Sequence, residues 1–175
     1  MNKAAERTKW ARAQIADARK VAKVGVPAKL GVRVIAVTRK KVTAEMTVKK
    51  FHLNRNGRVN GGAIMAFGDH VGAAGTVANL PPGHRTATLE SKTNFFAAGL
   101  GPVVSAVSIP LHIGRTTMVW QTTIRNADRR VVAIVTQTQI VIPAKSDGLS
   151  TTEETPPGRG KAELKRRARR RIASK

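Results

Sequence analysis

The feature that most constrains the fold is one long helical segment, residues 60–80, between two groups of strand-like runs. Its apolar side chains recur at the three-and-four spacing of a helix face, at Ile64, Phe67, Val71, Ala74 and Ala78. Runs rich in Val, Ile and Thr precede it at residues 30–37 and 42–48, and follow it at residues 86–96, 103–113, 116–124 and 131–142. Because helix and strands are segregated, this order predicts an α+β domain in which one antiparallel sheet wraps a single central helix.

The two ends of the chain differ from this middle part. Residues 2–24 predict an amphipathic helix with a basic face. After residue 143 the sequence becomes polar and then basic, which is typical of a solvated extension that is partly disordered or helical. We therefore divide the chain into an N-terminal basic helix (1–28), one globular domain (29–143) and a polar linker with a basic tail (144–175).

Composition narrows the classes of function. The net charge of +22 predicts an anionic partner, and nucleic acid, a membrane surface and the phosphates of a small molecule all qualify. The absence of cysteine excludes disulfides, thiolate zinc sites and a thiol nucleophile. No segment approaches the roughly 20 apolar residues of a membrane-spanning helix, and the N-terminus lacks the apolar stretch of a secretory signal. We therefore expect a cytoplasmic protein.

The predicted central helix is unusually rich in glycine, at Gly61, Gly62, Gly68, Gly72 and Gly75. Each glycine costs about 1 kcal/mol relative to alanine inside a helix. Small residues allow close packing against a sheet, and glycines in the first turn leave backbone N–H groups open to a ligand. The start of this helix is therefore a candidate site for an oxyanion or a phosphate.

Asp69 lies on the same predicted helix and is the candidate catalytic acid. The residues one turn away cannot pair with a carboxylate; they are Met65, Ala66, Gly72 and Ala73. From residue 46 to residue 127 the only other acid is Glu90. A carboxylate among apolar groups has its pKa raised, which suits a general base or a nucleophile.

These residues form a recognisable order of motifs. The motif N-x-x-G-x-x-N-G-G-A begins at Asn54, and Asp69 stands seven residues beyond Gly62. A T-x-E strand, an N-F-F segment and G-R-T follow. Over residues 29–142 the chain resembles the hotdog-fold acyl-CoA thioesterase superfamily, phenylacetyl-CoA thioesterase type.

The resemblance implies roles for five catalytic candidates. Asp69 would attack the thioester or activate water, and the Gly61 N–H would polarise the thioester carbonyl. Asn54 would position the water or the carbonyl, and Thr88 of a neighbouring subunit would hydrogen-bond the water. Asn60 stands where the family usually has His, and we expect it to cap the helix, because Asn is a preferred N-cap residue.

The resemblance also implies contacts and assembly. Candidate contacts with substrate or coenzyme A are Gly62, Met65, Phe95, Gly114, Arg115 and Thr116, with the acyl pocket around Met65, Phe67, Phe95 and Phe96. Coenzyme A is part of the substrate, and we expect no cofactor and no metal. We expect a homodimer, with a homotetramer as a dimer of dimers, and weak salt-sensitive contacts of the basic tail with anionic polymers or a membrane surface.

The expected function is hydrolysis of a small, aromatic or medium-chain acyl-CoA. Three alternatives stay open at this point. Asn60 in place of His suits a non-catalytic acyl-CoA-binding or regulatory hotdog protein. The basic termini suit a nucleic-acid-binding protein, although aromatic residues make up only 3% of the chain. A hotdog dehydratase would need a catalytic His, for which no matching motif is present.

Overall fold

The computed structural model describes residues 3–143, and the linker and basic tail expected over residues 144–175 lie outside them. The chain begins with α1 (Lys3–Lys20), the 3-10 turn η1 (Val21–Lys23) and α2 (Gly25–Lys29). The hairpin of β1 (Val32–Thr38) and β2 (Lys41–Thr47), the turn η2 (Lys50–His52) and the long helix α3 (Gly61–Val77) follow. Four strands complete the domain: β3 (Arg85–Phe95), β4 (Val103–Ile113), β5 (Thr117–Asn126) and β6 (Val131–Ile142).

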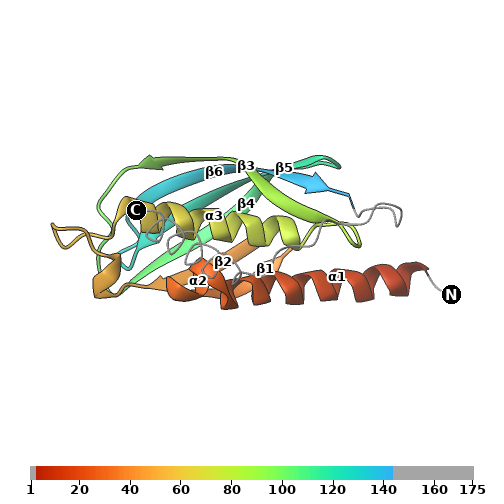
Figure 1. Cartoon of the computed structure of the whole chain (residues 1–175), viewed down its shortest axis with the longest axis horizontal. Coiled ribbons are helices and arrows are strands. Elements are labelled where there is room, and N and C mark those ends of the chain that lie inside the picture. The colour runs from red at the N-terminus through yellow and green to blue at the C-terminus, as the bar shows by residue number, and fades with distance from the viewer. Residues whose placement is uncertain (1–2, 144–175) are drawn as a thin grey trace, which may run out of the picture. The chain divides into compact units, whose positions relative to one another are not determined.

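The six strands form one antiparallel sheet in the order β1-β2-β4-β5-β6-β3. The sheet curves around α3, and α1 runs alongside α3 (Figure 1). β1 and β3 are the edge strands of the sheet. The predicted architecture, one antiparallel sheet around one long helix, is confirmed, and the strand ends agree with the sequence prediction to within two residues.

The glycines of α3 let the helix approach the sheet closely. A Cβ added at three of them would collide with the strands beneath: Gly68 with Val135, Gly72 with Gln137, and Gly75 with Trp120. At Gly75 that Cβ would lie 2.7 Å from three atoms of the Trp120 ring. Close packing of the helix on the sheet therefore offsets the helix propensity that the glycines lose.

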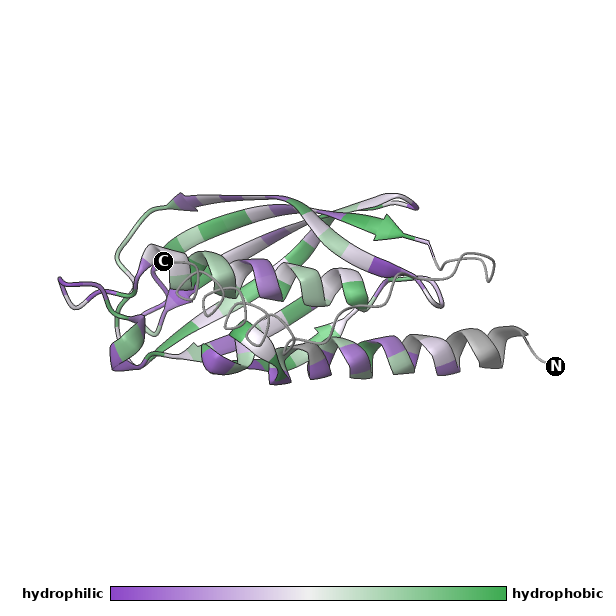
Figure 2. Ribbon diagram, in the orientation of Figure 1, coloured by the Kyte–Doolittle hydropathy of each residue, from purple (hydrophilic) through white to green (hydrophobic). Residues whose placement is uncertain are grey.

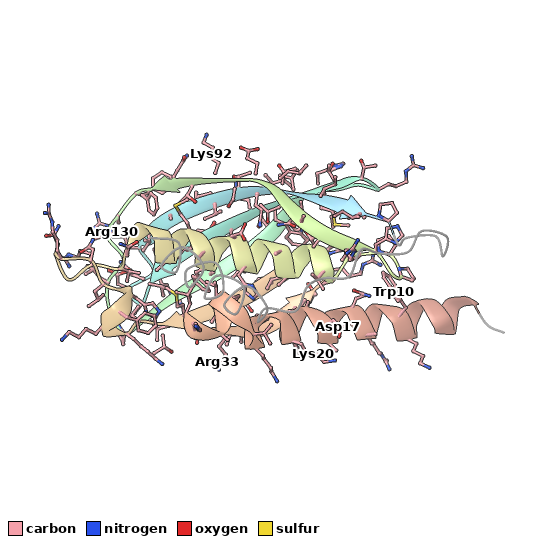
Figure 3. The ribbon with its side chains drawn as sticks, viewed as in Figure 1. Trp10, Asp17, Lys20, Arg33, Lys92 and Arg130 are labelled. Carbon is pink, nitrogen blue, oxygen red and sulfur yellow. The ribbon has the colours of Figure 1, made fainter. Side chains whose placement is uncertain are left out.

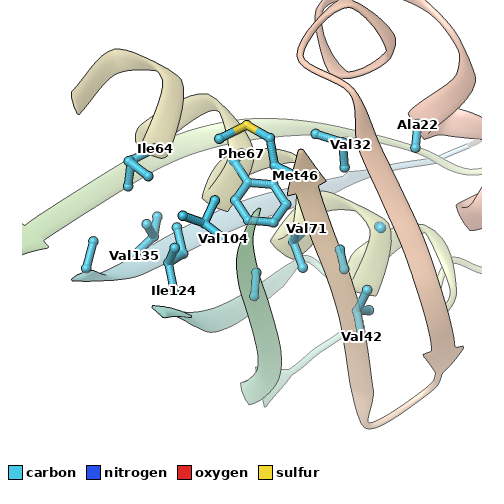
Figure 4. Close-up of a cluster of buried hydrophobic side chains, with 14 of the residues drawn as sticks. Ala22, Val32, Val42, Met46, Ile64, Phe67, Val71, Val104, Ile124 and Val135 are labelled. Carbon is cyan, nitrogen blue, oxygen red and sulfur yellow. The ribbon is translucent and has the colours of Figure 1, made fainter. Parts of the chain in front are cut away.

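The apolar stripe predicted for the central helix forms the core. Ile64, Phe67, Val71, Ala74 and Ala78 are each at most 1% exposed. Figure 4 shows the Phe67 ring among core side chains of the strands. Phe67 is fully buried, so its prediction as a wall of the acyl pocket is wrong, because its side chain faces the sheet.

The N-terminal helix is shorter than the predicted residues 2–24. α1 ends at Lys20, Val24 is extended, and Gly25 has a positive φ of 63° that starts α2 in a new direction. α1 packs on the core through Ala18, and η1 through Ala22; both residues belong to the main core cluster. Figure 2 shows hydrophilic residues along α1, whereas α3 is mostly apolar. Within residues 3–143, no helix combines the length and apolar character needed to cross a membrane.

Candidate active site

The first turn of α3 presents one capped and one free backbone N–H group. Asn60 is the N-cap, and its Oδ1 accepts a hydrogen bond from the Gly62 N–H at 2.7 Å. The expectation that Asn60 caps the helix is therefore confirmed. The Gly61 N–H has no acceptor among residues 3–143. An amide at the positive end of a helix dipole is suited to hold a developing negative charge.

An aromatic side chain lies against this amide turn. A Cβ added at Gly61 would lie 3.3 Å from Cζ of Phe95, at the end of β3. Phe95 is 50% exposed, and Met65, one turn along α3, is 42% exposed. The free amide therefore has apolar surface beside it, as a site for an acyl group requires.

Asp69 lies in the middle of α3 and receives hydrogen bonds from two strands. Nε2 of Gln137 on β6 donates to Asp69 Oδ1 at 2.6 Å, and the Thr88 hydroxyl on β3 donates to the same oxygen at 3.3 Å. Thr88 of the same chain makes this contact, so Asp69 needs no neighbouring subunit for it, and the expected contact of Thr88 with the water stays a prediction. The carboxylate has no cationic partner among the described residues, but it is not isolated from polar groups.

A bulge in β3 explains how two side chains of this strand, Thr88 and Ser91, both reach Asp69. The pairing of β3 with β6 shifts register between Thr88 and Glu90, so that Leu89 is the extra residue. Side chains three positions apart, at Thr88 and Ser91, can then both face the helix. The Thr88 hydroxyl donates to the Asp69 carboxylate at 3.3 Å, and the Ser91 hydroxyl also stabilises its charged form.

The electrostatics of Asp69 suit a catalytic carboxylate. Burial raises the pKa of Asp69 above its ordinary value of 3.8, and hydrogen bonds from Thr88 and Ser91 offset part of that rise. The raised pKa of Asp69 and its cause, burial among apolar groups, agree with the inference from the sequence. A carboxylate whose pKa is raised is a stronger base than an ordinary surface aspartate.

Two buried glutamines lie behind Asp69 and were not predicted from the sequence. Gln137 and Gln139 are each 1% exposed, and Gln139 Nε2 donates to the Thr88 hydroxyl oxygen at 2.8 Å. Their positions in the alternating pattern of β6 could have identified them from the sequence. Alternate residues from Ala133 to Val141 on β6 face the core, and these two amides occupy positions that are otherwise apolar.

The free amide and the carboxylate cannot serve one substrate atom within a single chain. Gly61 and Asp69 are eight residues apart on α3, which separates them by about 12 Å along the helix axis. An attacking group must lie within about 3.5 Å of the carbonyl carbon, and an oxyanion donor within about 3.1 Å of the oxygen. Within the described residues of one chain, the two groups therefore do not meet on the same thioester carbonyl.

The other predicted site residues lie apart from Asp69. Asn54 structures its own loop, because its Oδ1 accepts from the backbone N–H groups of Asn56 at 2.9 Å and Arg58 at 3.2 Å. The turn of Gly114, Arg115 and Thr116 joins β4 to β5. It is next to Met118, which packs with Leu80 beyond the C-terminal end of α3. Helix length places that end about 25 Å from Gly61.

Comparison with known proteins identifies the family. A family model described as Thioesterase superfamily matches residues 56–133. A proposed esterase of Bacillus subtilis is 31% identical over 116 residues, covering 65% of this chain and 90% of that protein. The chain belongs to the thioesterase superfamily. It is thus a hydrolase of thioester bonds, and its sheet around one helix is the hotdog fold.

Two further superfamily relatives each cover about two thirds of the chain. A 1,4-dihydroxy-2-naphthoyl-CoA hydrolase of Listeria monocytogenes is 22% identical over 111 residues, covering 63% of this chain and 90% of that protein. A hypothetical thioesterase of Streptococcus pneumoniae, solved with coenzyme A, is 26% identical with a TM-score of 0.59. That likeness covers 66% of this chain and 88% of the other. The phenylacetyl-CoA type stays a prediction.

Proposed function

We propose that this thioesterase hydrolyses acyl-CoA, with the Asp69 carboxylate as base or nucleophile. The main support for the proposal is the environment of the Asp69 carboxylate. Its carboxylate is half-buried, has a raised pKa, and is held only by uncharged donors. A structural aspartate on a helix is usually paired or solvated, whereas this one keeps a costly charge ready for chemistry.

The substrate class is supported by the surroundings of Gly61 and by the relatives. Phe95 and Met65 offer apolar surface beside the free amide. One relative is named as a hydrolase of an aromatic acyl-CoA, and one similar structure contains coenzyme A. We therefore favour small, aromatic or medium-chain acyl groups.

The active site is completed by a second protomer in this proposal. β3 is an edge strand of 11 residues, and Leu89 at its bulge is 60% exposed. Pairing of two such edges about a two-fold axis would run the two α3 helices in opposite directions. Gly61 of one protomer would then approach Asp69 of the partner subunit, which resolves the separation of about 12 Å within one chain. A dimer of such dimers remains part of the proposal.

The chemistry follows from these positions. The Gly61 N–H holds the thioester carbonyl oxygen, while Asp69 either takes a proton from water or attacks the carbonyl carbon itself. The resulting tetrahedral oxyanion is stabilised by the same N–H. The C–S bond then breaks, the thiolate of coenzyme A leaves and takes up a proton, and the carboxylic acid forms directly or after water opens an anhydride.

Replacement of Asp69 by Asn tests the proposal. The variant keeps the size of the side chain and an oxygen that can accept from Gln137, but it removes the base. We expect the turnover of a panel of short, medium-chain and aromatic acyl-CoAs to fall by a factor of about 10² to 10⁴. Turnover equal to that of the unaltered enzyme would remove Asp69 from the mechanism.

A further inference from the structure

The side chain of Gln137 occupies a space that the helix has left open for it. Gln137 is 1% exposed, and a Cβ added at Gly72 would overlap its Oε1. Its Nε2 lies 2.6 Å from Asp69 Oδ1, the shortest hydrogen bond to this carboxylate. Its Oε1 is buried without a partner among the described residues. An unsatisfied buried oxygen costs free energy, so the position of this amide is maintained for its donor end.

The hydrogen bonds around Gln137 all run toward Asp69. The Thr88 oxygen accepts from Gln139 Nε2 at 2.8 Å and from Gln137 Nε2 at 3.3 Å. Because two amides occupy its lone pairs, the Thr88 hydroxyl proton is directed to Asp69 Oδ1. Amide and hydroxyl donors therefore converge on one oxygen of the carboxylate.

We propose that Gln137 is a positioning residue that anchors Asp69 Oδ1, keeps the carboxylate ionised inside the protein, and leaves Oδ2 for the thioester. This inference rests on the proposed function of Asp69. Thr88 and Ser91 assist from β3, while Gln137 is the closest donor and the only one fully shielded from water. A donor bound to the charged form favours that form, and the effect is larger where water is excluded.

Among the described residues, no charged group near Asp69 stabilises its ionised form. β6 carries no titratable residue between Val131 and Ile142. On β3, Glu90 and Lys92 are exposed, and Lys92 points away from α3 (Figure 3). On α3 itself, burial lowers the pKa of His70 to about 4, so that His70 is neutral near pH 7. The ion pairs of the described residues, Lys20 with Asp17 and Arg33 with Glu45, lie on α1 and on the β1–β2 hairpin.

The test is a direct titration of Asp69 in Gln137→Met, which keeps the side-chain length and removes the donor. The chain has four aspartates, Asp17, Asp69, Asp128 and Asp147. Their carboxyl carbons can be labelled with ¹³C, and Asp69→Asn assigns the Asp69 signal. We expect the midpoint of Asp69 to rise by about 1 to 2 pH units when the donor is lost. The acid limb of the kcat/KM profile should rise with it.

Gln139→Met is the matched control, because Gln139 is equally buried two residues away and reaches Asp69 only through the Thr88 hydroxyl, to which Gln137 still donates. It should leave the midpoint within about half a unit of the unaltered protein. An unchanged Asp69 titration in folded Gln137→Met, or an equal shift in the control, would overturn the proposal.

A second variant and a separate hydrolysis assay distinguish failure of the anchoring role from failure of the proposed function. If Gln137→Met does not fold, Gln137→Glu preserves the shape and places a second carboxyl at Asp69, so the pair must titrate at higher pH; no rise would overturn the proposal. If the midpoint moves as expected but the unaltered protein hydrolyses no acyl-CoA, the proposed function fails and the anchoring of Asp69 stands. If hydrolysis is observed and the midpoint does not move, the anchoring fails alone.

Discussion

Substitution of Gly61 by Pro would remove one hydrogen atom from the site with little disturbance of the helix. Gly61 is the first residue of α3, a position where proline is favoured, and its N–H has no acceptor among residues 3–143. Asn60 already has the extended backbone that a residue before proline requires, with φ of −60° and ψ of 137°. The added ring would contact Phe95, which is half-exposed and can move.

The expected effects on stability and on catalysis therefore differ widely. Stability should change by less than about 1 kcal/mol, because no hydrogen bond is lost and the new residue suits the first turn. Loss of an oxyanion donor should lower kcat by about 10² to 10³, which corresponds to about 2.7 to 4 kcal/mol. KM should change much less, because the donor acts mainly on the charge that develops in the transition state.

The measurement is steady-state kinetics with the best acyl-CoA substrate, together with thermal unfolding. Gly61→Ala is the matched control, because it makes the same Cβ contact with Phe95 but keeps the N–H. It should retain most of the activity. A Gly61→Pro enzyme with unaltered kcat, or a Gly61→Ala enzyme that is equally impaired, would refute the assignment of this amide.

Variants at Asp69, Gly75 and Asn60 test the buried charge, the packing of α3 on the sheet and the helix cap. Burial raises the pKa of Asp69 in the folded state, so the folded protein loses stability as the pH rises through that pKa and the buried carboxyl group ionises. Asp69→Asn should therefore raise the thermal unfolding midpoint at about pH 8, and this gain should disappear at about pH 3, where Asp69 is protonated in both states. Gly75→Ala should destabilise the fold by about 1 to 2 kcal/mol in urea unfolding, because overpacking against the Trp120 ring outweighs the gain in helix propensity; a more stable variant would contradict the packing. Asn60→Ala should lose about 1 kcal/mol, and Asn60→Asp should restore it, if the bond to the Gly62 N–H caps α3 as the structure shows.

Local sequence signals predicted the fold well because each of them acts over a few residues. The stripe from Ile64 to Ala78 and the alternation in the strands are short-range patterns, and Asn60 caps a helix whose start it also marks. The helix end was placed less well. α3 ends at Val77 because the Asn79 amide donates to the Gly75 and Arg39 carbonyl oxygens, and Arg39 is 40 residues away in sequence.

The surroundings of Asp69 were not predictable in the same way. Gln137 is 68 residues from Asp69 and reaches it only through the pairing of β6 beneath α3. Thr88 and Ser91 both face Asp69 only because Leu89 is a bulge, which simple alternation does not indicate. The sequence thus points to Asp69 and the amide turn as candidates, while the register of the sheet determines which side chains hydrogen-bond Asp69.

In the proposed dimer, Gly61 of one protomer and Asp69 of the other act on the same thioester. Subunits carrying Asp69→Asn and subunits carrying Gly61→Pro can be given different tags, co-expressed, and purified as mixed dimers. Each mixed dimer has one site with both groups intact, so we expect about half the activity of the unaltered dimer, although each parent dimer is nearly inactive. Mixed dimers as inactive as their parents would show that Gly61 and Asp69 do not meet across an interface.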